Sequence, residues 1–599
     1  MPDAEASGAE GVRWDLSDLF AGPDDPRWRA ELDCALVDAA AFEGRYRGTI
    51  NLPGGPPPAH LRAALVAYEA IHTRSALAQS FARLLYAVDA SSSVHRELVA
   101  RTDQFATELR NRLLFVDLEW LELPEADAER VMADPVLANY REYLRRERLM
   151  RPHKLSELEE KVANEKDLTG RRAWTKLFQE ITSALSFPLP TDDGGTRPAT
   201  LAELMSRLYS PRRDVRQAAH DTLYGELARH SHVLTFTYDT LVQDHLTMDR
   251  LRRFPDPMFE RHLANNVPPE AVAEMMDVVE EHYGLAHRYF GAKARLLGLD
   301  KLQLWDQYAP IGEASALRPY DDARTIVLEA LAGFEPRFRD LAAEFFERSW
   351  IDAEVRPGKR GGAFCSYPVP TAHPYVLMNY TGNRRDVMTL AHELGHGIHG
   401  QLARGQTVVN YHPPLPLAET ASVFAEMLIF DHVLERESDP KVRLGLTASM
   451  VENVFATVFR QNVMTRFEQR VYAARGEGRL TTERVADLWW QANAPYYGEA
   501  LQMSEGYRLG WSYIPHFINT RFYCYAYTFG ELLVLALYSL YRERGRSFVP
   551  EYLRLLELGG SVAPAEAVAA LGVDVRDRAF WSKGFVEVAR LIDVVVADS

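Results

Sequence analysis

Two histidines and a glutamate form a compact motif in the segment LAHELGHGIHG, residues 390–400. His392 and His396 are four residues apart, so on a helix their imidazoles lie one turn apart and can reach one metal ion. Glu393 is turned by about 100° from His392, so its carboxylate stands beside such an ion and can take a proton from water. The pattern is typical of a zinc site that activates water for attack on a carbonyl.

The residues around this motif have the spacing of an amphipathic helix. One face is apolar and the three histidines fall on the opposite face; the apolar positions are Val387, Leu390, Leu394, Ile398 and Leu402. We expect Asp386 to cap the start of this helix. Gly395, Gly397 and Gly400 each disfavour a helix by about 1 kcal/mol relative to alanine. Their presence together predicts that another backbone, or a substrate, approaches the helix closely.

A third metal ligand is expected from the segment that follows, because catalytic zinc usually has three protein ligands. Position 402 is Leu402, which excludes the class of zinc peptidases that has a third histidine there. His399 lies on the histidine face, but two turns from the first histidine of the motif is too far to share one tetrahedral site. The prolines of PPLPLAETASVFAEML, residues 413–428, predict a new helix with Glu419 in its first turn and Glu426 on the same face. We assign Glu419 as the third ligand and Glu426 as a carboxylate that orients a ligand histidine.

Most of the chain has helical periodicity, and the sequence predicts a mainly α protein with a minor sheet. The segment at 450–476 predicts one long helix that ends at Gly476. The run YVLMNYTG at 375–382 is a β-strand candidate directly before the histidine motif. The Pro- and Gly-rich stretch at 187–201 is the strongest internal break, and we place a domain boundary near residue 200. The expected divisions are a disordered lead at 1–12, an N-terminal helical domain at 13–200 and a catalytic domain at 201–599.

Composition and charge indicate which classes of partner and which cellular compartment to expect. A net charge of −16 without a basic block argues against nucleic acid as a partner. The most apolar stretches are too short for a bilayer span, and the acidic start lacks the features of a secretory signal. Cys34, Cys365 and Cys524 are too few and too scattered for a disulfide framework. We expect a cytoplasmic protein with reduced thiols and no membrane or nucleic-acid partner.

Beyond the histidine motif, several stretches resemble one known family. HELGHGIH followed by AETASVFAE is similar to the oligoendopeptidase F branch of the thimet oligopeptidase family of zinc peptidases. Other parts of that family are resembled by RWDLSDLF (13–20), RPHKLSELEEKVANEKDLTGRRAW (151–174), GGAFCSY (361–367), IPHFINTRFYCYAYTFGELL (514–533) and GFVEVARLID (584–593). The likeness spans almost the whole chain.

The resemblance implies a fold, a cofactor and an activity. The fold would be a two-lobed, mainly helical shell around a deep substrate channel, with a small β-sheet beside the zinc helix. One zinc ion per chain would be bound by His392, His396 and Glu419, and Glu393 would be the general base. YVLMNY would be an edge strand along which a peptide substrate pairs. The implied activity is that of a zinc endopeptidase acting on short unstructured oligopeptides.

The aromatic stretch at 514–533 is implied to hold the reacting carbonyl of the substrate. His516 and one or more of Tyr523, Tyr525 and Tyr527 would donate hydrogen bonds to the oxyanion, because a neutral donor aimed at developing negative charge stabilises it. Tyr525 is narrowly preferred among the three tyrosines.

Three alternatives to this activity are considered. A metallocarboxypeptidase or dipeptidyl carboxypeptidase on a related helical fold would need a cation for a substrate's C-terminal carboxylate; the candidates are Arg384, Arg385, Arg460 and Arg466. A peptide-binding protein that has lost its activity is disfavoured by the intact ligand set. A Cys–His protease is disfavoured because neither Cys365 nor Cys524 has an activating context. Both cysteines stand where relatives are expected to have small or apolar residues, and they could make the enzyme sensitive to thiol reagents, although buried packing is the simpler interpretation.

Overall fold

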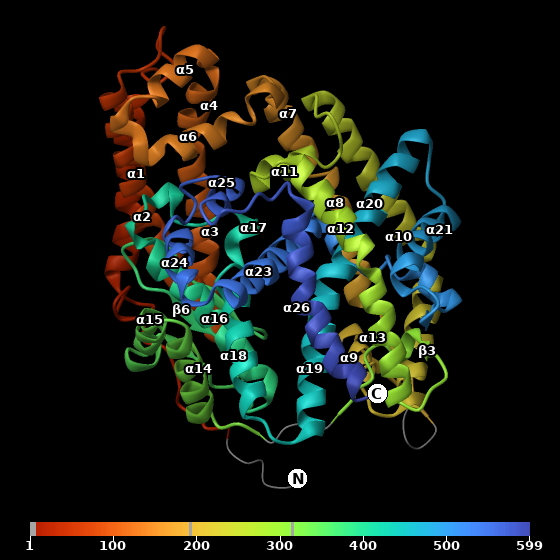
Figure 1. Ribbon diagram of the computed structural model, residues 1–599. Helices are drawn as coiled ribbons and strands as arrows, with labels where there is room; N and C mark the ends of the chain where they lie inside the picture. The colour runs from red at the N-terminus through yellow and green to blue at the C-terminus, as the bar shows by residue number, and fades with distance from the viewer. Residues whose placement is uncertain (1–6, 191–194, 313–316) are drawn as a thin grey trace. The chain divides into compact units, whose positions relative to one another are not determined.

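Helices make up most of the computed structural model, which describes residues 7–190, 195–312 and 317–599 (Figure 1). The sheets are small, with two or three short strands each. The expectation of a mainly α fold with a minor sheet is therefore confirmed. The chain divides into two units that interleave along the sequence. Unit 1 is Met1–Arg151, Ser315–Arg436 and Leu540–Asp574, and unit 2 is Pro152–Ala314, Glu437–Ser539 and Val575–Ser599.

Unit 1 begins with a bundle of long helices, and a sheet follows with the helices that carry the histidine motif. Its elements are α1 (Pro26–Tyr46), α2 (Pro58–Val88), α3 (Ser93–Leu113), α4 (Phe115–Glu122), α5 (Glu125–Met132), α6 (Arg141–Arg148), α14 (Tyr320–Phe334), α15 (Pro336–Glu347), β4 (Ile351–Asp352), β5 (Phe364–Ser366), β6 (Tyr375–Leu377), α16 (Arg384–Leu402), α17 (Leu415–Ala418), α18 (Ser422–Arg436), α24 (Val549–Glu557) and α25 (Pro564–Ala569).

Unit 2 contains the 40-residue helix α10. Its elements are α7 (Glu157–Asp167), α8 (Arg171–Ala184), β1 (Phe187–Pro190), β2 (Thr196–Ala199), α9 (Leu201–Arg207), α10 (Arg213–Arg252), α11 (Phe259–Asn265), α12 (Pro269–Glu281), α13 (Tyr283–Leu296), β3 (Leu302–Gln303), α19 (Pro440–Val454), the π-helical turn η6 (Phe455–Phe459), α20 (Arg460–Glu477), α21 (Thr482–Tyr497), β7 (Leu501–Gln502), α22 (His516–Asn519) and α26 (Arg578–Ala597). Helix α23 (Tyr525–Arg544) begins in unit 2 and ends in unit 1.

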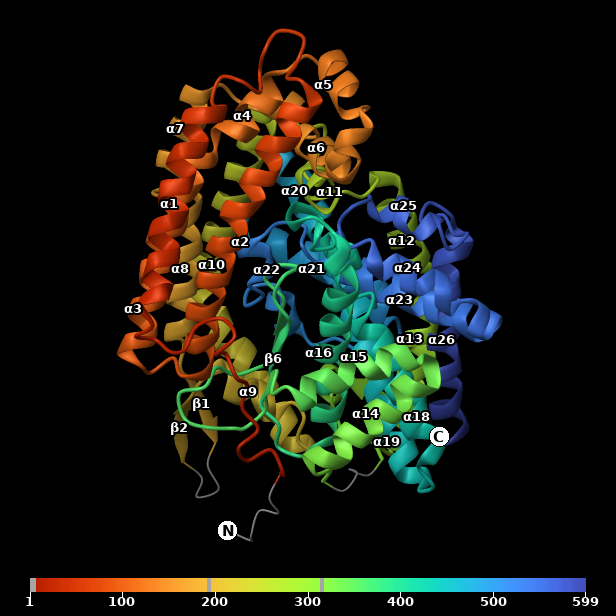
Figure 2. The same cartoon turned by 90° about the vertical axis from the view of Figure 1, so that its left-hand side faces the viewer.

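The first three helices of unit 1 lie side by side in both views (Figures 1 and 2). Helices α1 and α2 each begin with a proline, whose fixed φ suits the first helical turn and whose missing N–H costs nothing there. The indole N–H of Trp28 donates to the carbonyl of Ala78, which joins α1 to α2 inside an apolar core.

The units do not follow the predicted boundary near residue 200. The Pro- and Gly-rich stretch at 187–201 is not a linker but contains an antiparallel pair, in which β1 is in register with β2 from Phe187 opposite Ala199 to Pro190 opposite Thr196. Helices on both sides of this pair, α8 and α9, pack on α10. Residues before and after position 200 therefore belong to one unit.

We expected residues 1–12 to be a disordered lead, but residues 7–12 make backbone contacts with other parts of unit 1. The carbonyl of Ser7 accepts from the N–H of Tyr320, and that of Val12 accepts from the N–H of Ala353. The side chain of Ala9 is buried. Residues 7–12 are thus ordered against unit 1, and residues 1–6 lie outside the described residues.

The strand candidate at 375–382 is the central strand of its sheet rather than an edge strand. Strand β6 pairs in parallel with β4 and antiparallel with β5, so Val376 lies opposite Ile351 on one side and Cys365 on the other. All three residues of β6 are buried, as a continuous apolar run predicts for a covered strand. Strand β5 is therefore an outer strand of this sheet, and both β5 and β6 contact α16.

The helix expected at 450–476 is present, but it contains a π-helical turn. Helix α19 ends at Val454, a π-helical turn covers Phe455–Phe459, and α20 runs from Arg460 to Glu477. The chain thus leaves the helix after Glu477, with Gly478 at the C-cap, and not at Gly476. The π-helical turn leaves the apolar periodicity intact, so the sequence pattern alone did not reveal it.

Within the described ranges, no helix has both the length and the apolar character needed to cross a bilayer.

Candidate metal centre

Helix α16 carries the histidine motif, and its start differs from the expected one. Asn383 is the N-cap, and its side-chain oxygen accepts from the N–H of Asp386. Asp386 lies in the first turn instead, where its carboxylate accepts from the N–H and the hydroxyl of Thr381. A carboxylate in the first turn is favourable to the helix dipole, which explains an acidic residue at this position. The predicted apolar face of α16 is buried.

The glycines of α16 are needed because neighbouring groups lie too close for a side chain. A Cβ atom at Gly395 would lie 2.5 Å from the Cα of Ser422, on helix α18. At Gly397 and Gly400 it would meet the rings of Phe345 and Tyr367. The prediction of a close backbone approach is therefore correct for Gly395, whereas at the other two positions aromatic side chains fill the space.

His392, His396 and Glu419 come together as a group that could hold a metal ion. The Nε2 atoms of the two histidines are 3.2 Å apart, and Oε2 of Glu419 lies 3.4 Å from each of them. Ligands at the corners of a tetrahedron with zinc bonds of about 2.0–2.1 Å are about 3.3 Å apart. The three ligand atoms therefore have the spacing of one face of a tetrahedral zinc site, and the donor set of two imidazoles and a carboxylate suits zinc.

Glu419 reaches this group from a position between two helices. The short helix α17 ends at Ala418, and α18 begins at Ser422, so Glu419 is not in the first turn of one continuous helix as expected. The hydroxyl of Ser422 donates to Oε2 of Glu419 over 2.7 Å and fixes the carboxylate. The sequence analysis missed Ser422, although a serine three residues after a proposed ligand glutamate was a visible signal.

Glu426 lies on helix α18, and its carboxylate contacts Nδ1 of His392 on helix α16. Its Oε1 accepts from Nδ1 of His392 over 2.5 Å, which leaves Nε2 of that ring directed at the metal group. Such a carboxylate–histidine pair fixes the orientation and tautomer of a metal ligand. Burial alone would lower the pKa of His392, but the hydrogen bond and charge of Glu426 raise it to about 9.

Glu393 is buried beside the metal group but is not part of it. Burial raises the pKa of Glu393 to about 7, and the charges of Glu419 and Glu426 act in the same direction. His399 is more deeply buried and also lies outside the group; burial lowers its pKa to about 3. Cys365 on β5 is close enough to Glu393 that the carboxylate's charge, after burial, contributes to the raised pKa of the thiol.

The aromatic stretch forms its own cluster inside unit 2. The ring of His516, at the start of α22, lies 6.1 Å from that of Tyr523 and 5.9 Å from that of Tyr527. The rings of Tyr523 and Tyr527 are 5.2 Å apart. Tyr525 points elsewhere: its hydroxyl is buried, accepts from Nδ2 of Asn265 and lies 3.1 Å from Nδ1 of His262. The hydroxyl of Tyr525 is therefore already in contact with two side chains of unit 2.

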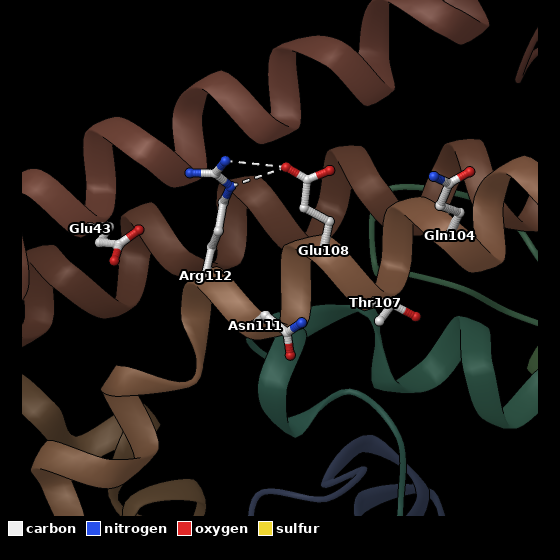
Figure 3. A pocket seen from close by; sticks show the side chains of 6 residues that line it. All are labelled: Glu43, Gln104, Thr107, Glu108, Asn111 and Arg112. Atoms are coloured by element: carbon white, nitrogen blue, oxygen red, sulfur yellow. Dashed lines mark hydrogen bonds and ion pairs between the residues drawn. The ribbon is translucent and has the colours of Figure 1, made fainter. Parts of the chain in front are cut away.

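An open hollow beside α3 has a different character (Figure 3). Its lining is polar, and the residues are Glu43, Gln104, Thr107, Glu108, Asn111 and Arg112. The ion pair between Arg112 and Glu108 joins two exposed side chains one helical turn apart. Such a pair contributes little to stability, and none of the lining residues is a histidine.

Comparison with known proteins places this chain in a family. The family model described as "Peptidase family M3" matches residues 206–587, which is more than half of the chain. The chain belongs to peptidase family M3. A second family model, described as "Oligopeptidase F", matches residues 119–187 of this family M3 peptidase. The two matches lie on either side of residue 200, whereas the spatial units cross that position. The resemblance noted from the sequence motifs is confirmed.

Full-length relatives agree with this assignment. Oligopeptidase PepF of Bacillus subtilis is 27% identical over 589 residues, which cover 96% of this chain and 85% of the relative. A crystal structure from Chlamydophila abortus has a TM-score of 0.89 at 23% identity and covers 99% of this chain and 100% of its own. Oligoendopeptidase-F from Enterococcus faecium has a TM-score of 0.69 at 23% identity, covering 95% and 99%. The family M3 peptidase is a metallo-oligopeptidase with the mainly helical fold of these structures.

Proposed function

We propose that this family M3 peptidase is a zinc-dependent endopeptidase that hydrolyses internal bonds of short unstructured peptides. The observation that carries the proposal is the triangle of 3.2, 3.4 and 3.4 Å between the ligand atoms of His392, His396 and Glu419. These three side chains would hold the ion, and Glu426 would orient His392. When bound, zinc would polarise the scissile carbonyl and lower the pKa of water.

Glu393 is proposed as the general base. It precedes the second ligand histidine by three residues, so its carboxylate lies beside the ligand group without joining it. From there it would accept the proton of the attacking water and return it to the amine of the leaving peptide. Burial of Glu393 excludes bulk water, which would otherwise compete for the same proton.

Oxyanion stabilisation is proposed for His516 with Tyr523 or Tyr527. These three rings form one cluster, and neutral O–H and N–H groups stabilise a developing negative charge. Burial, and then the charge of Arg460, lower the pKa of His516, which keeps the imidazole neutral near pH 7. Tyr525 is the weaker candidate because its hydroxyl is already engaged by His262 and Asn265.

The strand proposed to guide the substrate is β5 rather than β6. Strand β5 is an outer strand of its sheet, contacts α16 and places Cys365 near Glu393. A peptide that pairs with an outer strand is held mainly by backbone hydrogen bonds, which tolerate many side chains. Broad sequence specificity is the expected consequence.

The test uses a fluorescence-quenched peptide blocked at both ends, with zinc content measured on the same protein samples. We expect internal cleavage by the wild type, loss of cleavage after chelation and recovery on adding zinc. Glu393→Gln should keep zinc and lose activity by at least about 100-fold. His396→Ala should lose zinc itself.

Two outcomes would contradict the proposal. Full activity in Glu393→Gln would remove the general base from the mechanism. Cleavage only of peptides with a free C-terminus would identify a carboxypeptidase instead. Glu435→Gln, an exposed carboxylate on α18, is the matched control and should behave as the wild type in both assays.

A further inference from the structure

A small cavity inside unit 2 is lined in part by Arg460, whose charge lowers the pKa of His516 but which has no direct role in the proposed mechanism. The cavity has a volume of about 30 Å³. Its lining is mostly aromatic, and the residues are Met205, Leu208, His220, Leu223, Tyr224, Leu304, Trp305, Gln307, Tyr308, Arg460, Tyr497, Tyr507 and Tyr513. Every one of them belongs to unit 2.

Arg460 differs from the other enclosed arginines of unit 2 because it has no carboxylate partner. Arg216 pairs with Asp306 and Arg521 with Asp249, each at 2.6–2.8 Å. Among the described residues, no aspartate or glutamate forms an ion pair with Arg460, and tyrosines surround its guanidinium. Arg460 is half-buried, and a guanidinium that is partly withdrawn from water without a counter-charge is unfavourable.

The groups around Arg460 are hydrogen-bond donors. Burial raises the pKa of Tyr513, so its phenol stays protonated, and Tyr513 lines the cavity together with Arg460. The indole N–H of Trp305 is buried without a hydrogen-bond partner among the described residues. The hydroxyls of Tyr497 and Tyr507 donate to side-chain oxygens of Gln307 and Asn493, so they too remain neutral phenols. The hydroxyls of Tyr497 and Tyr507 are thus already engaged, and the cavity lining offers one positive charge, the free indole N–H of Trp305 and no carboxylate.

The backbone directly before Arg460 forms a π-helical turn. The N–H of Arg460 bonds to the carbonyl of Phe455, five residues earlier, and so closes the π-helical turn. The hydroxyl of Thr528 donates to the carbonyl of Val458 in the same turn. A π-turn costs regular helical hydrogen bonding and occurs frequently at functional sites. It places Arg460 at the first position of α20, beside the cavity.

We propose that this cavity is a binding site for a small monovalent anion of the size of chloride. The guanidinium supplies the charge, and the phenol of Tyr513 and the indole of Trp305 supply neutral donors. A cavity of this volume holds about two water molecules, which matches one monatomic anion and is too small for the end of a peptide. The residues that line the cavity all belong to unit 2, whereas the three residues of the metal group belong to unit 1.

The direct test is a crystal of the full-length protein soaked in sodium bromide. We expect an anomalous bromine peak within hydrogen-bond distance of the Arg460 guanidinium. The solution test is a titration of thermal stability with sodium chloride against sodium gluconate at constant ionic strength. Wild type should be stabilised by chloride in a saturable manner. Tyr513→Phe, which keeps the ring and removes one donor, should weaken apparent chloride affinity about tenfold.

Arg460→Gln should abolish the chloride effect, and the exposed Arg470→Gln on the same helix should leave it unchanged. Tyr513→Phe keeps the test decisive if Arg460→Gln does not fold. Absence of a bromine peak in the wild type, or an equal chloride effect in Tyr513→Phe, would overturn the proposal. A weaker KM of Arg460→Gln for free-acid peptides but not for their amides, without any chloride effect in wild type, would assign the site to a peptide carboxylate instead.

Discussion

The carboxylate of Glu426 lies 2.5 Å from Nδ1 of His392, although the two residues belong to different helices. Helix α18 supplies the carboxylate and α16 the imidazole, and these two helices pack closely along their length. The orientation of a proposed metal ligand therefore depends directly on how these helices pack.

Glu426→Ala should weaken zinc binding by about 10- to 100-fold, because the ring of His392 loses the partner that fixes its orientation. Activity at saturating zinc should fall much less. The measurement is zinc affinity by competition with a chromophoric chelator. Glu435→Ala on the same helix is the control. Unchanged affinity in Glu426→Ala would remove this carboxylate from the metal centre.

Gly395→Ala should destabilise the protein even though alanine is the better helix former by about 1 kcal/mol. The added Cβ would lie 2.5 Å from the Cα of Ser422 and 2.6 Å from the carbonyl oxygen of Ala421. Overpacking of this kind typically costs about 1–3 kcal/mol. Thermal unfolding measures the effect, and Gly405→Ala, which meets nothing within 4 Å, should be nearly neutral. Equal melting temperatures would contradict the close approach.

Glu468 makes the stability of the fold depend on pH. Burial raises its pKa to about 8, and the N–H of Phe522, held at a positive φ of 51°, donates to its carboxyl group. The folded-state pKa exceeds the ordinary value of 4.5, so the folded protein holds this proton more tightly than the unfolded chain does. The contribution of protonated Glu468 to the free energy of unfolding is therefore fully present below about pH 4.5 and is lost as pH rises through 8.

Glu468→Gln should therefore gain stability relative to wild type as the pH rises from 5 to 8.5. At about 1.4 kcal/mol per pH unit, the gain should be roughly 1–4 kcal/mol. Chemical denaturation across this pH range measures the difference, and the exposed Glu477→Gln on the same helix should show no such trend. A difference that does not vary with pH would show that Glu468 is ionised in the fold.

Thiol reagents should modify one cysteine rapidly at pH 7.5. Cys34 is exposed, whereas burial raises the pKa of Cys365 and Cys524, so their thiols stay protonated and unreactive. Titration with a disulfide reagent should give one fast equivalent in wild type and none in Cys34→Ser. Activity should survive the fast phase. Rapid inactivation of Cys34→Ser would instead identify a reactive thiol near the metal centre.

Substitutions of the tyrosines should separate structural from substrate contacts. Tyr525→Phe removes a buried hydroxyl bonded to Asn265 and should lower stability by about 1 kcal/mol with little change in kcat. At least one of Tyr523→Phe and Tyr527→Phe should reduce kcat. A large loss of kcat in Tyr525→Phe alone would restore the preference drawn from the sequence.

Local chemistry was predictable from the sequence, whereas long-range packing was not. The i, i+4 histidines and the glutamate after the prolines were sufficient to predict that His392, His396 and Glu419 lie together, because helix geometry fixes the spacing of the two histidines. The cap at Asn383 was missed because Asp386, an equally suitable capping residue, lies three positions later.

Strand order and unit boundaries have no comparable local signal. The residues of β6 do not show whether one strand or two pair with it. Its central position follows only from the positions of β4 and β5. The stretch at 187–201 has the composition of a linker, yet it contains a paired hairpin packed on α10. The π-turn before Arg460 does not disturb the apolar periodicity of the sequence, so the pattern gave no sign of it.

The interleaved segments have a consequence for synthesis on the ribosome. Helix α24, near the end of the chain, packs on α16, and the final helix α26 packs on α13 and α19. Domains usually fold as units while the chain emerges from its N-terminus. Here the ribosome must release nearly the entire chain before either unit has all its packing partners. A nascent chain would therefore expose apolar helix faces until α24 and α26 have been synthesised.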